Sequence, residues 1–177
     1  MNHSLKVFLG VAASAVLMTG AALAQSKQSA DRMTSADNTF ITKAAQGGMA
    51  EVALGKLAQT NASSDKVKQF GKRMVDDHTT AGYELSTIAS KKGVTMPSGL
   101  DAKDQALKDK LSKLNGSDFD KAYMQDMVKD HRADVAEFKK EANSGQDADV
   151  KAFAAKTLPT LEDHLKNAES TLTEIKK

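Results

Sequence analysis

Three histidines in this chain have the placement expected of metal ligands. His78, His131 and His164 each follow an aspartate, and the sequence has four histidines in all. The first two end nearly identical segments, residues 74–78 and 127–131, which both begin with Met-Val and end with Asp-His. Neutral imidazole is a good ligand for Zn, Fe, Cu or Mn. The repeated pattern therefore indicates a transition-metal site.

A glutamate joins these histidines through its position in an apolar stripe. Glu51 shares helical spacing with Phe40 and Leu54, and each of the three histidines also falls on the apolar stripe of its segment. A buried carboxylate or imidazole is costly unless it has a partner. We therefore predict that Glu51, His78, His131 and His164 meet in the interior and form a metal site.

The apolar periodicity predicts four long helices and one short one. Turn and capping residues bound each segment, among them Asp37, Ser64, Ser117 and Asp147 as the first residues or N-caps. Ser117 and Asp120, three positions apart, have the spacing of a capping box in its acidic variant. The predicted long helices cover residues 37–59, 64–92, 117–144 and 147–175, and a lysine-rich segment at 101–114 forms the short helix. Counted from the turns, the four candidate ligands lie roughly 17 to 28 Å along helices about 40 Å long.

Short turns at residues 61–64 and 144–147 require two antiparallel helix pairs, which a long connection must join. The predicted fold is all-α, a ferritin-like four-helix bundle with a long crossover connection that carries the short extra helix. Bundle cores are a known location for metal sites.

The first 24 residues have the features of a signal peptide. A lysine at position 6 precedes an apolar run, which ends in Ala22-Leu23-Ala24. We expect cleavage between Ala24 and Gln25, a flexible leader over residues 25–36 and one domain over 37–177, in the periplasm or otherwise exported. The alternative is an uncleaved anchor, for which the run is short. Once the signal peptide has been cleaved, no stable membrane insertion is expected.

Composition excludes several classes of protein. The chain has 25 basic and 23 acidic side chains, and these alternate without a basic block, so nucleic acid is not an expected partner. Cysteine is absent, so the domain must be stable without disulfides. The sequence contains no P-loop, dinucleotide-binding fingerprint or nucleophile elbow, and no catalytic residue can be assigned.

Some alternatives remain open from the sequence alone. A hydrogen-bonded network of Glu51 and the histidines without metal would also explain why these side chains lie on apolar stripes. The protein would then be an envelope interaction or structural protein. Asp134, three residues after His131, is a plausible additional carboxylate ligand. The aspartates that precede the histidines lie on another side of their helices, about 100° away. We expect them to contact the ligand side chains from outside or to lie on the surface. Met74 and Met127 would favour copper if they took part.

The sequence resembles the exported bacterial family of domain of unknown function 4142, which belongs with the ferritin-like folds. The resemblance extends from about Asp37 to Leu172. It rests on Phe40, Glu51, the segments 54–58, 67–70, 74–78 and 127–131, and Leu158-Pro159 before His164. It implies a periplasmic or envelope-associated helical bundle linked to stress, with no established reaction.

Di-iron ferritins carry Glu-x-x-His on two helices, but this chain has Val75, Val128 and Leu161 three residues before its histidines. Oxygen-activating chemistry is therefore disfavoured. The expected role is binding of a transition metal for metal handling or envelope stress protection.

Overall fold

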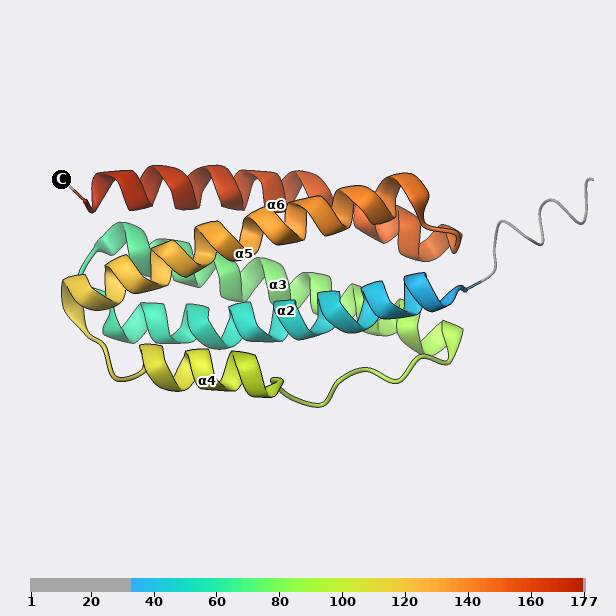
Figure 1. Cartoon of the computed structure of the whole chain (residues 1–177), viewed down its shortest axis with the longest axis horizontal. Helices are drawn as coiled ribbons and strands as arrows, with labels where there is room; N and C mark the ends of the chain where they lie inside the picture. The colour runs from blue at the N-terminus through green and yellow to red at the C-terminus, as the bar shows by residue number, and fades with distance from the viewer. Residues whose placement is uncertain (1–32, 177) are drawn as a thin grey trace, which may run out of the picture.

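The computed structural model describes residues 33–176, which form five helices (Figure 1). They are α2 (Ser35–Asn61), α3 (Asp65–Lys92), α4 (Ala102–Leu111), α5 (Gly116–Ser144) and α6 (Ala148–Glu174). The predicted signal peptide and most of the predicted leader lie outside the described residues. None of the helices in the described part has the length and apolar character needed to cross a membrane.

The helices pack as two pairs. α2 packs mainly against α3, and α5 packs mainly against α6, because only a few residues separate the members of each pair. The pairs meet where α2 contacts α5 and where α3 contacts α6. α4 lies beside α2 in the connection between the pairs (Figure 1). The prediction of an all-α fold with two helix pairs and a short extra helix is confirmed.

Two apolar clusters form the core, one toward each end of the helices. The first contains Leu54, Phe70, Met74, Tyr123 and Met127, with eight further buried residues. The second contains Phe40, Ile41, Leu85, Phe138, Phe153 and Leu161, with four others. In every long helix, one of the four predicted ligands lies between the residues of one apolar cluster and the residues of the other. The polar side chains thus form a layer between the two clusters.

Several helix ends differ from the predictions. The first long helix begins two residues earlier than expected: Thr34 is its N-cap, and Asp37 completes a capping box as the third helical residue. Asp120 does not form a box with Ser117, because Asn115 is the N-cap of α5. Instead, the Asp120 carboxylate accepts hydrogen bonds from the backbone of Ser63 and Ser64 at the α2–α3 turn. Asp147 caps α6 as predicted.

α2 and α3 approach each other closely at two glycines. A Cβ added at Gly55 would lie 2.6 Å from the carbonyl oxygen of Gly71, and one added at Gly71 would lie 2.5 Å from Ala58 Cβ. Real Cβ atoms do not tolerate such contacts, so both positions require glycine. This contact brings the backbones together one turn from Glu51 and sets the separation of the helices at the polar layer.

Gly55→Ala should therefore lower the free energy of unfolding by about 1–3 kcal/mol, since the helices must separate to admit the methyl group. Gly47→Ala in the same helix is the matched control, because no atom lies within 4 Å of its added Cβ. That substitution should raise stability by roughly 0.5–1 kcal/mol. Urea unfolding followed by circular dichroism measures both, and equal effects of the two substitutions would contradict the close-contact assignment.

Candidate metal centre

The four predicted ligands come together from four helices. Glu51 lies on α2, His78 on α3, His131 on α5 and His164 on α6. Glu51, His131 and His164 are fully buried and His78 is 9% exposed. One ligand atom from each histidine lies within 4.8 Å of the others. The four side chains thus lie close together, as the sequence predicted. Metal binding itself remains a proposal.

The hydrogen bonds of His131 and His164 determine where their protons lie. His131 Nδ1 is 2.9 Å from the carbonyl oxygen of Met127, which can only accept, so Nδ1 carries the proton. His164 Nε2 is 2.7 Å from the Asp77 carboxylate. Burial alone would raise the pKa of Asp77, but the hydrogen bonds from His164 and Arg73 lower it. Asp77 is therefore ionised, and His164 Nε2 is the donor.

The inner nitrogens of these two rings are consequently both acceptors when the rings are neutral. His131 Nε2 lies 3.3 Å from His164 Nδ1 and 3.3 Å from Glu51 Oε2. Burial, together with the charges of His78 and His131, lowers the pKa of His164 to about 4, so this ring is neutral near pH 7. When both rings are neutral, two lone pairs and a carboxylate oxygen face one another in a dry interior. Only a cation placed among them, a proton or a metal ion, satisfies all three.

His78 and Glu51 form the charged part of the layer. His78 Nε2 lies 2.6 Å from Glu51 Oε2. Burial favours neutral forms, but mutual attraction prevails: the pKa of Glu51 falls to about 2, and the pKa of His78 rises. The contact is not aligned as a hydrogen bond, and both Glu51 oxygens and His78 Nε2 lack a hydrogen-bond partner among the described residues. These atoms are close together, yet each retains unused ligand capacity.

Two further carboxylates approach Glu51 from α5. One oxygen each from Glu51, Asp130 and Asp134 lies within 4.8 Å of the others. Burial and the charges of Glu51 and Asp130 raise the pKa of Asp134 to about 8; burial and the charges of Glu51 and Asp126 raise that of Asp130 to about 6. Asp134 was anticipated as an additional carboxylate. Asp130 was not placed near Glu51, because its position one residue before His131 indicated another face of the helix.

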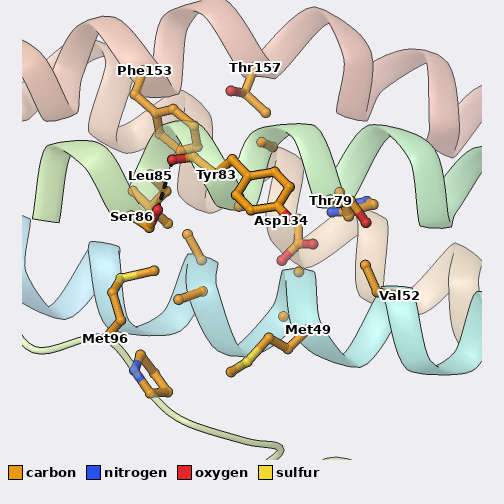
Figure 2. A pocket seen from close by; sticks show the side chains of 18 of the residues that line it. Met49, Val52, Thr79, Tyr83, Leu85, Ser86, Met96, Asp134, Phe153 and Thr157 are labelled. Carbon is orange, nitrogen blue, oxygen red and sulfur yellow. Dashed lines mark hydrogen bonds between the residues drawn. The ribbon is translucent and has the colours of Figure 1, made fainter.

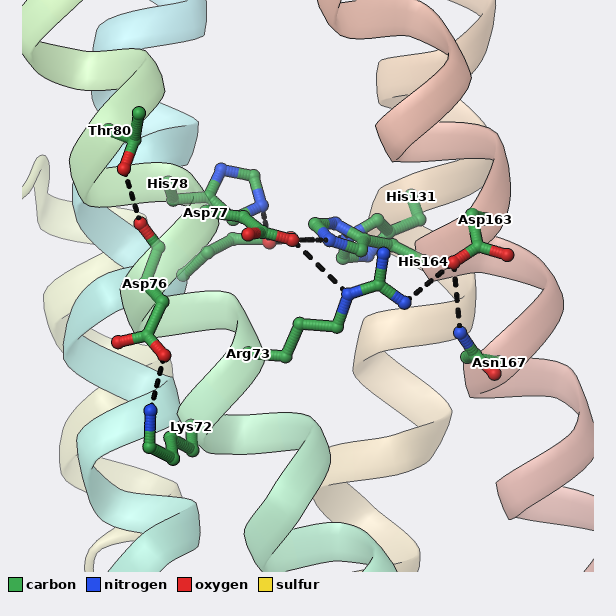
Figure 3. A network of polar contacts seen from close by, with 11 residues as sticks. Lys72, Arg73, Asp76, Asp77, His78, Thr80, His131, Asp163, His164 and Asn167 are labelled. Atoms are coloured by element: carbon green, nitrogen blue, oxygen red, sulfur yellow. Dashed lines mark hydrogen bonds and ion pairs between the residues drawn. The ribbon is translucent and has the colours of Figure 1, made fainter.

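The remaining aspartates support His164 from outside (Figure 3). Asp77 accepts from His164, and Arg73 donates to both Asp77 and Asp163, at 3.2 and 2.6 Å. These aspartates therefore lie behind the ligands, as expected for Asp77 and Asp163. Met74 and Met127 pack in the first apolar cluster. A solvent-accessible cavity of about 200 Å³, lined in part by Asp77, His78 and His164, reaches the centre from outside.

The fold and the site define a helical protein with a buried polar centre, and comparison with known proteins identifies its family. The family model for domain of unknown function DUF4142 matches residues 22–171. The chain therefore belongs to the DUF4142 family. No curated protein gives a significant match to the sequence.

Two crystal structures have the same fold. A DUF305 fragment from Deinococcus radiodurans is similar with a TM-score of 0.70 at 13% identity, over 80% of this chain and 97% of that one. A candidate secreted DUF305 protein from Streptomyces coelicolor has a TM-score of 0.68 at 16% identity, over 79% and 92% of the two chains. At these identities the likeness establishes the fold alone.

The ion pair between Glu51 and His78 should make the stability of the fold depend on pH. The pKa of Glu51 in the folded protein lies below that of an unfolded glutamate, so its ionisation stabilises the fold above about pH 4.5. This contribution is lost as the pH falls toward about 2. In metal-free protein, Glu51→Gln should lower the free energy of unfolding by roughly 3 kcal/mol at pH 7, and the difference from the wild type should shrink below pH 4.5.

Urea unfolding at several pH values measures this difference. Glu169→Gln is the control, because Glu169 forms an exposed ion pair with Arg132 and should change stability by less than about 0.5 kcal/mol. A constant difference between pH 7 and pH 3 for Glu51→Gln would show that its ionisation does not support the fold.

Proposed function

We propose that this protein is an exported, ferritin-like four-helix bundle that binds a transition metal ion through Glu51, His78, His131 and His164. The observation that carries the proposal is the excess of acceptors in the polar layer. His131 and His164 use their outer nitrogens as donors and direct their inner nitrogens at each other, 3.3 Å apart, beside the Glu51 carboxylate. A divalent ion supplies the positive charge that all of these atoms lack.

The spacing of the donor atoms supports this proposal. Ligands bound tetrahedrally at about 2.0–2.1 Å are separated from one another by roughly 3.3 Å. The distances from His131 Nε2 to His164 Nδ1 and to Glu51 Oε2 are both 3.3 Å. The 2.6 Å contact between His78 and Glu51 is shorter, and it would lengthen when both side chains bind one ion. Three imidazoles and a carboxylate suit Zn, Fe, Mn or Cu.

The outer contacts of the rings also match a metal site. Metal-bound histidines usually donate their second N–H to a carboxylate or a carbonyl, which fixes the ring and increases its basicity. Asp77 fills this role for His164, and the Met127 carbonyl fills it for His131. A shared proton would join the same two inner nitrogens, so metal analysis distinguishes a metal site from a metal-free network.

The proposed role is metal handling or envelope stress protection rather than catalysis. The positions three before the histidines hold Val75, Val128 and Leu161, so the Glu-x-x-His motif of di-iron enzymes is absent. The proposal includes a signal peptide over residues 1–24, cleavage between Ala24 and Gln25, a leader over 25–36 and the domain from 37. Export is consistent with the candidate secreted DUF305 protein of the same fold.

Elemental analysis and calorimetric titration test the proposal. The purified protein should bind a transition metal stoichiometrically, and the double variant His78→Ala/His131→Ala should lose it. The wild type and the double variant must both remain helical by circular dichroism. If the wild type binds no ion while the double variant only loses stability, the layer is a metal-free network and the protein is a structural or interaction protein of the envelope.

Asp77 allows a finer test. Asp77→Asn should weaken metal binding by roughly tenfold to a hundredfold, because the amide no longer accepts from His164 as a carboxylate does. Asp76→Asn is the matched control, since the neighbouring Asp76 is exposed and pairs with Lys72. Competition titrations against a chelator of known affinity compare the two. Equal affinities would show that Asp77 does not support a bound ion.

A further inference from the structure

A second cavity lies beside the polar layer, and it is larger and more apolar than the one that reaches His164. Its volume is about 410 Å³, and α2, α3, α5, α6 and the segment after α3 all contribute to its wall (Figure 2). Apolar lining residues include Met49, Val52, Leu85, Met96, Phe138 and Phe153. At about 30 Å³ for each water-sized group, such a space holds roughly a dozen non-hydrogen atoms. Small-molecule sites have this size and character.

Part of the cavity wall consists of helical glycines, which have no side chains. Gly47, Gly48 and Gly82 line the cavity from within α2 and α3. A Cβ added at Gly47 or Gly82 would meet no atom within 4 Å, unlike one added at Gly55 or Gly71. Glycine weakens the interior of a helix. Neither Gly47 nor Gly82 is required for helix packing, so their effect is to leave room in the cavity.

The cavity carries one acidic side chain and no lysine or arginine among its described lining residues. That side chain is Asp134, which stands among the lining side chains in Figure 2 and lies close to Glu51 and Asp130. Asp134 has no hydrogen bond or ion pair in the described part of the chain. His78, the lining histidine, already pairs with Glu51 at 2.6 Å. An anionic ligand would thus find acidic neighbours and no free cation.

Aromatic rings complete the chemistry of the site. Tyr83 lines the cavity although it is 73% exposed, and Phe138 and Phe153 lie deeper in the wall. The face of an aromatic ring attracts an ammonium group. Because the pKa of Asp134 is about 8, its carboxyl group is mostly protonated in the empty cavity at pH 7. An ammonium group placed beside it would favour the ionised form and donate a charge-assisted hydrogen bond to it. The cavity therefore combines an apolar volume, a single carboxyl group and aromatic rings, of which that of Tyr83 is exposed.

We propose that this cavity binds a small apolar amine, whose ammonium group pairs with Asp134 while its alkyl or aryl body fills the space left by Gly47, Gly48 and Gly82. The site borders the proposed metal centre, because His78 lines the cavity and Asp134 lies close to Glu51, but amine binding requires no metal ion.

Nuclear magnetic resonance on chelator-treated protein tests the proposal. The probes are decylammonium, decanol and decanoate, each below the concentration at which it forms micelles. Decylammonium should shift the amide signals of Gly47, Gly48 and Gly82 in a saturable way and leave Gly99, outside the cavity, unchanged. Decanol should bind more weakly, and decanoate should bind most weakly. Decanoate affinity equal to that of decylammonium would overturn the proposal.

Two variants separate charge from shape. Asp134→Asn should weaken decylammonium binding about tenfold, the scale of a charge-assisted contact, and leave decanol binding within about twofold. Gly82→Leu should abolish binding of both by filling the cavity, while Gly82→Ala retains it. Both Gly82 variants should match or exceed the wild-type melting temperature. Unchanged decylammonium binding in Asp134→Asn or in Gly82→Leu would refute the site.

The outcomes of these experiments are separable from those for the metal centre. Loss of metal binding with retained amine binding would contradict only the proposed function. Glycine signals that shift with protein concentration alone would show that a second copy of the chain covers the cavity, and this would also overturn the amine proposal.

Discussion

Four ionisable side chains that meet in the dry interior are the constraint around which this protein is arranged. Glu51 and three imidazoles occupy a layer where an apolar core would otherwise be continuous. Burying ionisable groups is expensive unless they are paired, and removing one partner of a buried pair commonly costs several kcal/mol. The layer is therefore tolerated only because its members contact one another, and a cation of some kind is part of its charge balance.

The layer also restricts how the helices can pack. A shift of one long helix by a single turn, about 5.4 Å, would move its polar side chain into an apolar cluster and bring an apolar side chain to Glu51. The clusters therefore specify the register from both sides. The close contact at Gly55 and Gly71 adds a second restriction, because it allows α2 and α3 to meet at one separation near the layer.

The sequence predicted what depends on periodicity and missed what depends on orientation between helices. Helix boundaries came within a few residues, and the four buried polar groups were found because each interrupts an apolar stripe. Asp120 was misassigned because its partners, Ser63 and Ser64, lie in another turn of the chain. Asp130 was missed because helical spacing alone cannot reveal that α2 places Glu51 against that side of α5. The cavity beside Asp134 depends on five segments, and no single stretch of sequence contains it.

The polar layer and the cavity have the same electrostatic character. Glu51 is the common neighbour of the histidines on one side and of Asp130 and Asp134 on the other. Two further carboxyl groups and three imidazoles thus lie close to Glu51, and burial limits how far water can compensate their charges. In the layer, the acceptors converge within ligand distance and define a position for an ion. In the cavity, Asp134 is the acidic side chain among the described lining residues and faces an apolar wall, which defines a position for a charged group with an apolar body. The difference in ligand follows from geometry, while the preference for positive charge follows from the carboxyl groups that border both sites.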